Sequence, residues 1–194
     1  MTEPANASRQ PVHTRQVVCT GYVRDDGLLE IEGRLLDTRS RHASLFFKDV
    51  PAGNAIHAMR VVVTVDQELV VRHIEAQTDT GPTPYCAQIN AAYQRLVGIA
   101  FRGGFMKDVK ARLGGPNGCT HLTELLGPIA TTAVQTRMAL QSAGRAAAGT
   151  RPSGDDVRVS AMRDTCYAWR ENGEVMQIVR AKDTRADLAT REGK

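Results

Sequence analysis

The chain is poor in aromatic residues, since Phe, Trp and Tyr make up 5% of its 194 residues. Surfaces that stack nucleic-acid bases are built from such rings, so the sequence offers little material for one. The net charge is +4, yet Lys and Arg are interleaved with Asp and Glu along the whole chain. No basic block marks a nucleic-acid surface, and nucleic acid is not an expected partner.

Long hydrophobic runs are also missing. No apolar stretch approaches the roughly 20 residues that a membrane span needs. Residues 1–11 are polar and lack the basic-then-apolar pattern of a signal peptide. We therefore expect a protein that spans no membrane and stays in the cytoplasm.

The four cysteines include no closely spaced CxxC pair. Thiols normally stay reduced in the cytoplasm, so disulfides are not expected. Cys86 and Cys119 are candidate ligands or nucleophiles. Cys166 is either a further ligand or a core residue of a strand. Cys19, in an alternating apolar run, fits a packing residue best.

The length of the chain suits one domain with a single hydrophobic core. Residues 1–11 and 183–194 are predicted to be flexible tails. Residues 146–156, which are rich in Ala, Gly, Pro and Ser, are predicted to be a surface linker. The predicted single domain therefore spans 12–182.

Alternating and β-branched segments fill the first part of the chain. Asp25-Asp26-Gly27 separates two of these segments and is a strong hairpin signal. The segments predict an antiparallel meander with strands at 15–23, 28–37, 59–65 and 69–76.

The hydrophobic period changes to that of helices after Pro84. Helices are predicted over 86–97, 106–113 and 119–142. Gly127-Pro128 lies inside the third helix and predicts a bend, because an internal proline removes one helical hydrogen bond.

A C-terminal hairpin is predicted around Asn172-Gly173, a favoured type I′ turn pair, with strands at 165–170 and 174–179. Strands followed by helices predict an α+β fold. We expect an antiparallel sheet, built from the N-terminal meander and the C-terminal hairpin, that about three helices cover on one face.

Gly118-Cys119-Thr120-His121-Leu122 places a thiol and an imidazole two residues apart at a predicted helix start. Unpaired backbone N–H groups and the positive end of the helix dipole favour a thiolate there. The thiolate is both the nucleophilic and the metal-binding form of cysteine. Cys119 and His121 are therefore the leading candidates for chemistry.

His57 and Cys86 also lie at the ends of predicted elements. Together with Cys119 and His121 they form a ligand set that suits tetrahedral Zn²⁺. The alternative is a metal-free site in which Cys119 is a nucleophile or proton donor, with His121 or His57 as the base. Each of these residues taken singly also fits a structural role.

A second polar set lies near the N-terminus, and its members are His13, Arg15, Arg24, Asp25, Asp26, Glu32 and Asp37. Arg15 or Arg24 could bind a substrate carboxylate through two parallel hydrogen bonds, oriented by Asp25 or Glu32. The alternative is a set of cross-strand ion pairs. Tyr85 is a further candidate for contact with substrate.

The chain contains the motifs His13-Thr14-Arg15, Arg24-Asp25-Asp26-Gly27, Pro84-Tyr85-Cys86, Gly118-Cys119-Thr120-His121-Leu122 and Asp164-Thr165-Cys166. Together they resemble a bacterial family catalogued as a domain of unknown function (DUF2889). The resemblance covers nearly the whole chain and implies a shared site at Cys119 and His121. It also implies substrates among aromatic or steroid-like compounds, because such proteins are common in bacteria that degrade them.

Residues 53–135 are more distantly similar to the iron–sulfur scaffold fold of the IscU and NifU type. His57 falls near the first scaffold cysteine, Cys86 at the second and Cys119 at the third. Because a histidine replaces one thiol, the similarity implies a mononuclear metal at least as well as a cluster. Zinc is the first metal to expect, ahead of iron or an iron–sulfur cluster, and no nucleotide cofactor is expected.

These features predict a small-molecule enzyme of the lyase or hydrolase type that acts as a homodimer. Two alternatives stay open. The same residues could serve a metal or cluster carrier, and a non-catalytic binding module would use them as core and cap.

Overall fold

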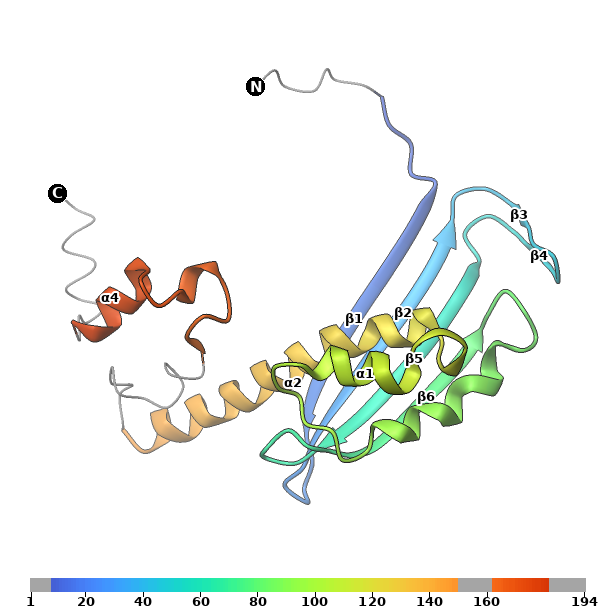
Figure 1. The fold of residues 1–194 in the computed structure, drawn as a ribbon. Coiled ribbons are helices and arrows are strands. Elements are labelled where there is room, and N and C mark those ends of the chain that lie inside the picture. Colours follow the sequence, from blue (N-terminus) through green and yellow to red (C-terminus); the bar gives the residue numbers. More distant parts are fainter. Residues whose placement is uncertain (1–7, 150–161, 182–194) are drawn as a thin grey trace. The chain divides into compact units, whose positions relative to one another are not determined.

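Figure 1 shows the computed structural model, which describes residues 8–149 and 162–181. The chain forms two compact units that divide between Leu140 and Gln141. Within the described residues, no helix combines the length and hydropathy needed to cross a membrane.

The first unit is built on a four-stranded antiparallel sheet with the strand order β1-β2-β5-β6. Its strands are β1 (His13–Val23), β2 (Leu29–Arg39), β5 (Ala55–Val65) and β6 (Val71–Thr80). The predicted four-strand meander is confirmed, including the turn before β2, where Gly27 has a φ of 81°. A short hairpin of β3 (Ala43–Ser44) and β4 (Asp49–Val50) interrupts the meander and was not predicted.

Three of the predicted helical segments follow the sheet. They are the 3-10 helix η1 (Cys86–Leu96), α1 (Phe105–Leu113) and α2 (Thr120–Ala147), with a single 3-10 turn, η2 (Gly115–Asn117), before α2. Helix α2 carries Pro128 in its interior.

Helix α2 continues beyond the predicted end at Ser142, so the prediction of a linker from Ala146 is wrong for Ala146 and Ala147. The rest of the predicted linker from 150 lies outside the described residues, as do 1–7 and 183–194 of the predicted tails.

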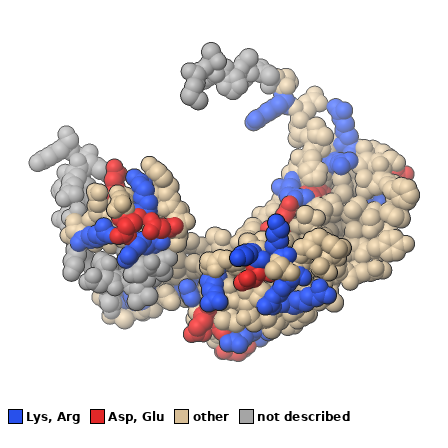
Figure 2. Space-filling view, in the orientation of Figure 1, with Lys and Arg blue, Asp and Glu red and all other residues tan. Residues whose placement is uncertain are grey.

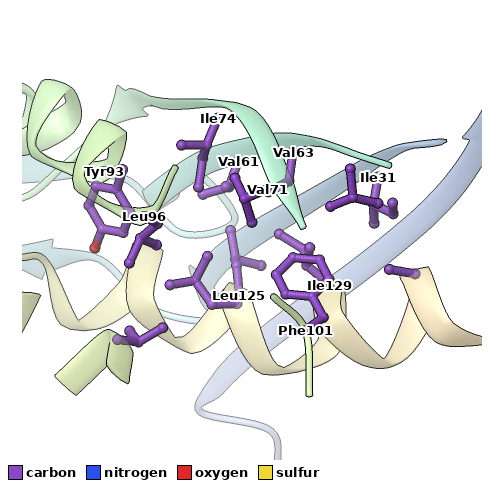
Figure 3. Close-up of a cluster of buried hydrophobic side chains, with 14 of the residues drawn as sticks. Ile31, Val61, Val63, Val71, Ile74, Tyr93, Leu96, Phe101, Leu125 and Ile129 are labelled. Carbon is purple, nitrogen blue, oxygen red and sulfur yellow. The ribbon is translucent and has the colours of Figure 1, made fainter. Parts of the chain in front are cut away.

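The hydrophobic core lies between the helices and one face of the sheet, as Figure 3 shows for Ile31, Val63, Leu125 and Ile129. Two strand glycines let α2 come close. A Cβ on Gly33 would lie 2.7 Å from Ile129 Cδ1, and one on Gly21 would lie 1.9 Å from Thr136 Oγ1. The predicted α+β fold with about three helices on one face is confirmed. Figure 2 shows basic and acidic side chains interspersed on the outer surface of these helices.

The second unit contains a 3-10 turn, η3 (Tyr167–Trp169), and the helix α4 (Glu174–Arg180). The predicted C-terminal hairpin is therefore wrong. A type I′ turn needs a positive φ at both central residues, whereas Gly173 has a φ of −87° and precedes a helix. Val175, Met176 and Val179 also fit a helix, with Met176 buried.

Candidate functional site

Three polar residues lie directly opposite one another on neighbouring strands at one end of the sheet. Arg15 on β1 pairs with Asp37 on β2, which in turn pairs with His57 on β5. The inward-facing positions of β2 before Asp37 are apolar, with Leu29, Ile31 and Leu35 fully buried or nearly so. Because side chains alternate along a strand, Asp37 faces the same side as this core.

The carboxylate of Asp37 is fully buried, and four N–H groups reach its two oxygens. Arg15 binds through two parallel hydrogen bonds, from Nε to Oδ1 at 2.8 Å and from Nη2 to Oδ2 at 2.7 Å. His13 Nε2 lies 3.3 Å from Oδ1, and His57 Nδ1 lies 2.9 Å from Oδ2. These contacts use the main hydrogen-bonding capacity of the carboxylate.

Burial opposes the charge of Asp37, but the hydrogen bonds and charge of Arg15 outweigh it, and His57 and His13 add to their effect. The pKa of Asp37 is lowered to about 2. At neutral pH the carboxylate therefore only accepts, so His57 must donate its Nδ1 proton to Oδ2. In neutral His57 the lone pair then lies on Nε2, where it can accept a proton or bind a metal.

The start of α2 brings Cys119 and His121 to this row. Tyr93 of η1 holds the helix start, because its hydroxyl accepts a hydrogen bond from the Cys119 N–H at 3.1 Å and lies 2.8 Å from the Cys119 carbonyl oxygen. It also lies 2.8 Å from Thr123 Oγ1. Tyr93 is fully buried, and burial raises its pKa, so the hydroxyl keeps its proton.

The imidazole rings of His57 and His121 are stacked, with centroids 3.7 Å apart. Burial lowers the pKa of His57, and the charge of His121 lowers it further, while Asp37 acts in the opposite direction. Two positive rings at this separation would repel each other. Cys119 Sγ lies 3.9 Å from His121 Nδ1 on the other side of this pair.

A second ion pair joins α2 to the strands. Arg15 donates from Nη1 to Glu124, one turn along α2 from Thr120, while its other nitrogens hold Asp37. Glu124 is half exposed and Arg15 is one-third exposed, so this end of the site reaches the surface. His57 keeps 12% of its side chain accessible.

Asp37, His57 and His121 each offer one ligand atom, and these atoms lie within 4.8 Å of one another. Two imidazoles and a carboxylate form a ligand set that suits zinc or iron. This group shares His57 and His121 with the metal site expected from the sequence, but it has Asp37 in place of Cys86 and Cys119.

The structure brings His57, Cys119 and His121 together but places other predicted site residues elsewhere. Cys86 begins η1 and has its Sγ 3.2 Å from Thr83 Oγ1. Arg24 pairs with Asp26 and Glu30 at the opposite end of β1, next to Asp25 in the exposed turn.

Three further candidates lie outside the histidine pair. Tyr85 is exposed and makes an edge-to-face contact with Phe47. Cys19 packs against the core, as predicted. Cys166 is exposed in the second unit, so the prediction that it faces a core is wrong.

Asp37 and Tyr93 contact the candidate site residues His57 and Cys119, but the sequence predicts no specific role for either. Asp37 belongs to the N-terminal polar set, for which substrate binding and cross-strand ion pairing are both expected, and it occupies an inward position in the alternation of β2. A charged residue at an inward position of an otherwise apolar strand face is the sequence feature that indicates a special role for Asp37. The hydroxyl contact of Tyr93 to Cys119 joins residues 26 positions apart, so no local sequence pattern indicates it.

Comparison with known proteins identifies one family. A family model described as "Protein of unknown function (DUF2889)" matches residues 13–135. This stretch includes all the residues of the site described above, which are His13, Arg15, Asp37, His57, Tyr93, Cys119, His121 and Glu124. No curated protein and no solved structure matches the chain.

Proposed function

The chain belongs to the DUF2889 family of proteins of unknown function, and from its site we propose a small-molecule enzyme of the lyase or hydrolase type that works by acid–base catalysis. His57 is the general base and Asp37 orients it. His121 and Cys119 complete the site as a second proton-carrying group and a nucleophile or proton donor.

The observation that carries this proposal is that both oxygens of the buried Asp37 carboxylate are hydrogen-bonded. Four N–H groups surround a fully buried carboxylate, and one of them is His57 Nδ1. A base needs a fixed ring, a defined tautomer and an anion that stabilises the imidazolium after proton uptake. Asp37 supplies all three to His57, and the lowered pKa of His57 leaves Nε2 free to accept a proton at neutral pH.

His121 and Cys119 extend the path for protons. His57 takes a proton from substrate or water, and the His121 ring lies stacked on it with the centroids 3.7 Å apart. His121 can then release its proton toward a leaving group or exchange it with the nearby Cys119 thiol. This coupling suits an elimination or a hydrolysis, in which one proton is removed and another delivered.

Activity assays on a panel of small esters, thioesters and β-hydroxy carbonyl compounds test the proposal. His57→Gln should reduce turnover of any accepted compound by about 100-fold or more, which is typical of a lost general base. His42→Gln is the matched control, because His42 is exposed and lies outside the cluster. Equal turnover in His57→Gln and the parent protein would contradict the assignment.

A metal or iron–sulfur cluster carrier is the second candidate, and the Asp37, His57 and His121 group favours it. A metal on Asp37 would have to displace one of its hydrogen bonds, and the most exposed of these donors is His13. Zinc or iron held in this way would take one ligand atom from each of Asp37, His57 and His121.

Elemental analysis by plasma mass spectrometry distinguishes the two candidates, provided that the protein is purified without an affinity metal. Near-stoichiometric zinc or iron that is lost in His121→Gln supports the carrier or a metal-dependent enzyme. The acid–base proposal predicts the same low metal content in the parent protein, in His121→Gln and in Cys119→Ser.

A further inference from the structure

The two edge strands of the sheet, β1 and β6, differ in how far other parts of the chain cover their outer backbone groups. The outer edge of β6 is covered, because the Gly98 N–H donates to Val71, Val71 donates to Ile99, and the Gln94 side chain donates to the Ile74 carbonyl. The β6 edge also carries exposed charged residues, and its pairing with β5 contains two bulges. These features discourage pairing with another strand.

Among the described residues, none covers the outer edge of β1 in this way. Across residues 8–149 and 162–181, the backbone ladder of β1 runs to β2 alone. Its register with β2 is continuous over eleven residues. The stretch from Gln16 to Val23 contains no charged residue and no proline. A long, regular and uncharged edge is a ready template for another strand.

The side chains of this edge are apolar and exposed. Val17 is 41% accessible, Val18 58%, Tyr22 47% and Val23 55%. Val18 and Tyr22 project on the face of the sheet away from the helices, while Val17 and Val23 project on the helix side. Both faces of the strand therefore present apolar surface next to unpaired backbone groups, which indicates an interface.

We propose that β1 pairs antiparallel with β1 of a second copy of this chain, which joins the two sheets across a twofold axis at Val18. Full overlap of the eleven-residue strand puts Val18 opposite itself, Gln16 opposite Thr20 of the partner subunit and Arg15 opposite Gly21 of the partner subunit. No like charges meet in this register. A second copy fits because an antiparallel twofold pair needs a strand that is complementary to itself.

The pairing has a consequence for the site. His13 lies opposite Val23 of the partner subunit, so the turn that holds Arg24 and Asp25 of the partner subunit comes to the end of β1 that carries Arg15. The sequence predicts substrate contacts for Arg24 and Asp25, which the single chain places far from Asp37 along β1. The pairing itself does not depend on the proposed acid–base chemistry.

Oligomeric state tests the proposal directly. Light scattering after size exclusion at micromolar concentration should give twice the chain mass of 21.1 kDa. Val18→Lys should raise the dissociation constant of the dimer about tenfold or more, because two lysines then face each other at the axis. His73→Lys, on the exposed part of β6, should leave the dimer intact. A monomeric parent protein, or a dimer that Val18→Lys does not weaken, overturns the proposal.

Crosslinking tests the register and does not depend on the solubility of the lysine variant. In a Cys19→Ser, Cys166→Ser background, Val18→Cys should form a disulfide between the two copies of residue 18 under mild oxidation, read out by peptide mass spectrometry. Thr20→Cys is the matched control, because the two copies of residue 20 lie roughly 13 Å apart along the strands, beyond disulfide reach. Equal crosslinking of both variants, or of neither, contradicts the register.

Discussion

Asp37 places a buried carboxylate at the end of the apolar inward face of β2. The inward face of β2 is apolar through Leu35, and the next inward position holds a carboxylate that no water reaches. A buried charge is costly unless donors surround it. Arg15, His13 and His57 meet that need, and the same contacts fix the tautomer of His57.

Asp37→Asn should alter the acid dependence of stability. The folded pKa of about 2 lies below the unfolded value of 3.8, so the charged group stabilises the fold above pH 3.8 and loses this effect as the pH falls toward 2. The difference corresponds to about 2 kcal/mol at neutral pH. Urea unfolding from pH 2 to pH 7 should show a flatter profile for Asp37→Asn.

The control for this experiment is Asp25→Asn, because Asp25 is an exposed residue of the β1–β2 turn. Its stability profile should follow that of the parent protein. If the free energy of unfolding depends on pH in the same way in Asp37→Asn and in the parent protein, the charge of Asp37 is not the source of the predicted stabilisation.

Tyr93→Phe should weaken the start of α2. The change leaves the Cys119 N–H without its hydroxyl partner in a buried setting, which costs about 1–3 kcal/mol. Chemical denaturation measures the loss, and faster alkylation of Cys119 by iodoacetamide would report the looser helix start. Tyr85→Phe is the control, because Tyr85 is exposed, and its stability should stay within about 0.5 kcal/mol of the parent protein.

Secondary-structure elements were predictable where the hydrophobic period was long. The four strands of the main sheet and the start of α2 after the Gly-Pro loop follow from alternation and helical spacing. Short segments were not predictable in the same way. Residues 174–180 contain four apolar residues in a run too short to show a clear period, and the Asn-Gly pair before them favours a hairpin turn although Gly173 precedes a helix.

Helix α2 depends on glycine in the strands beneath it. Gly33→Ala should destabilise the fold by about 1–3 kcal/mol, because the new Cβ would lie 2.7 Å from Ile129 Cδ1 in a packed core. Gly127→Ala is the matched change within α2, where nothing lies within 4 Å of an added Cβ. It should be neutral or stabilise by up to about 1 kcal/mol. Thermal unfolding that ranks the two variants in the reverse order would contradict the packing.

For the whole molecule, every residue of the main hydrophobic core lies between Leu29 and Ala133. A chain that ends at Ala147 should therefore keep a cooperative unfolding transition and the Asp37–His57 contact. A chain that ends at Gly127 should not, because it lacks Ile129 and Ala133. Circular dichroism melting and histidine NMR signals check both variants. Loss of cooperative unfolding in the longer variant would show that the first unit needs residues beyond 147.

The site as a whole was only partly predictable because it gathers residues from distant parts of the chain. Cys119 and His121 are close in sequence and formed a visible motif, whereas Asp37 and His57 meet only through the register of β2 and β5. Local sequence patterns predict where the strands lie. They do not predict which residues of β2 and β5 pair at the strand ends, where a bulge follows Asp37. The metal ligand set, the reaction and the dimer stay predictions.

The most direct test of the proposed base is the protonation state of His57. Long-range ¹H–¹⁵N NMR across a pH titration reports the tautomer and the pKa of each histidine. We expect His57 to be neutral at pH 7, with its proton on Nδ1 and a pKa below the ordinary value of 6.5. A His57 that is charged at pH 7, or that carries its proton on Nε2, would contradict its role as the base.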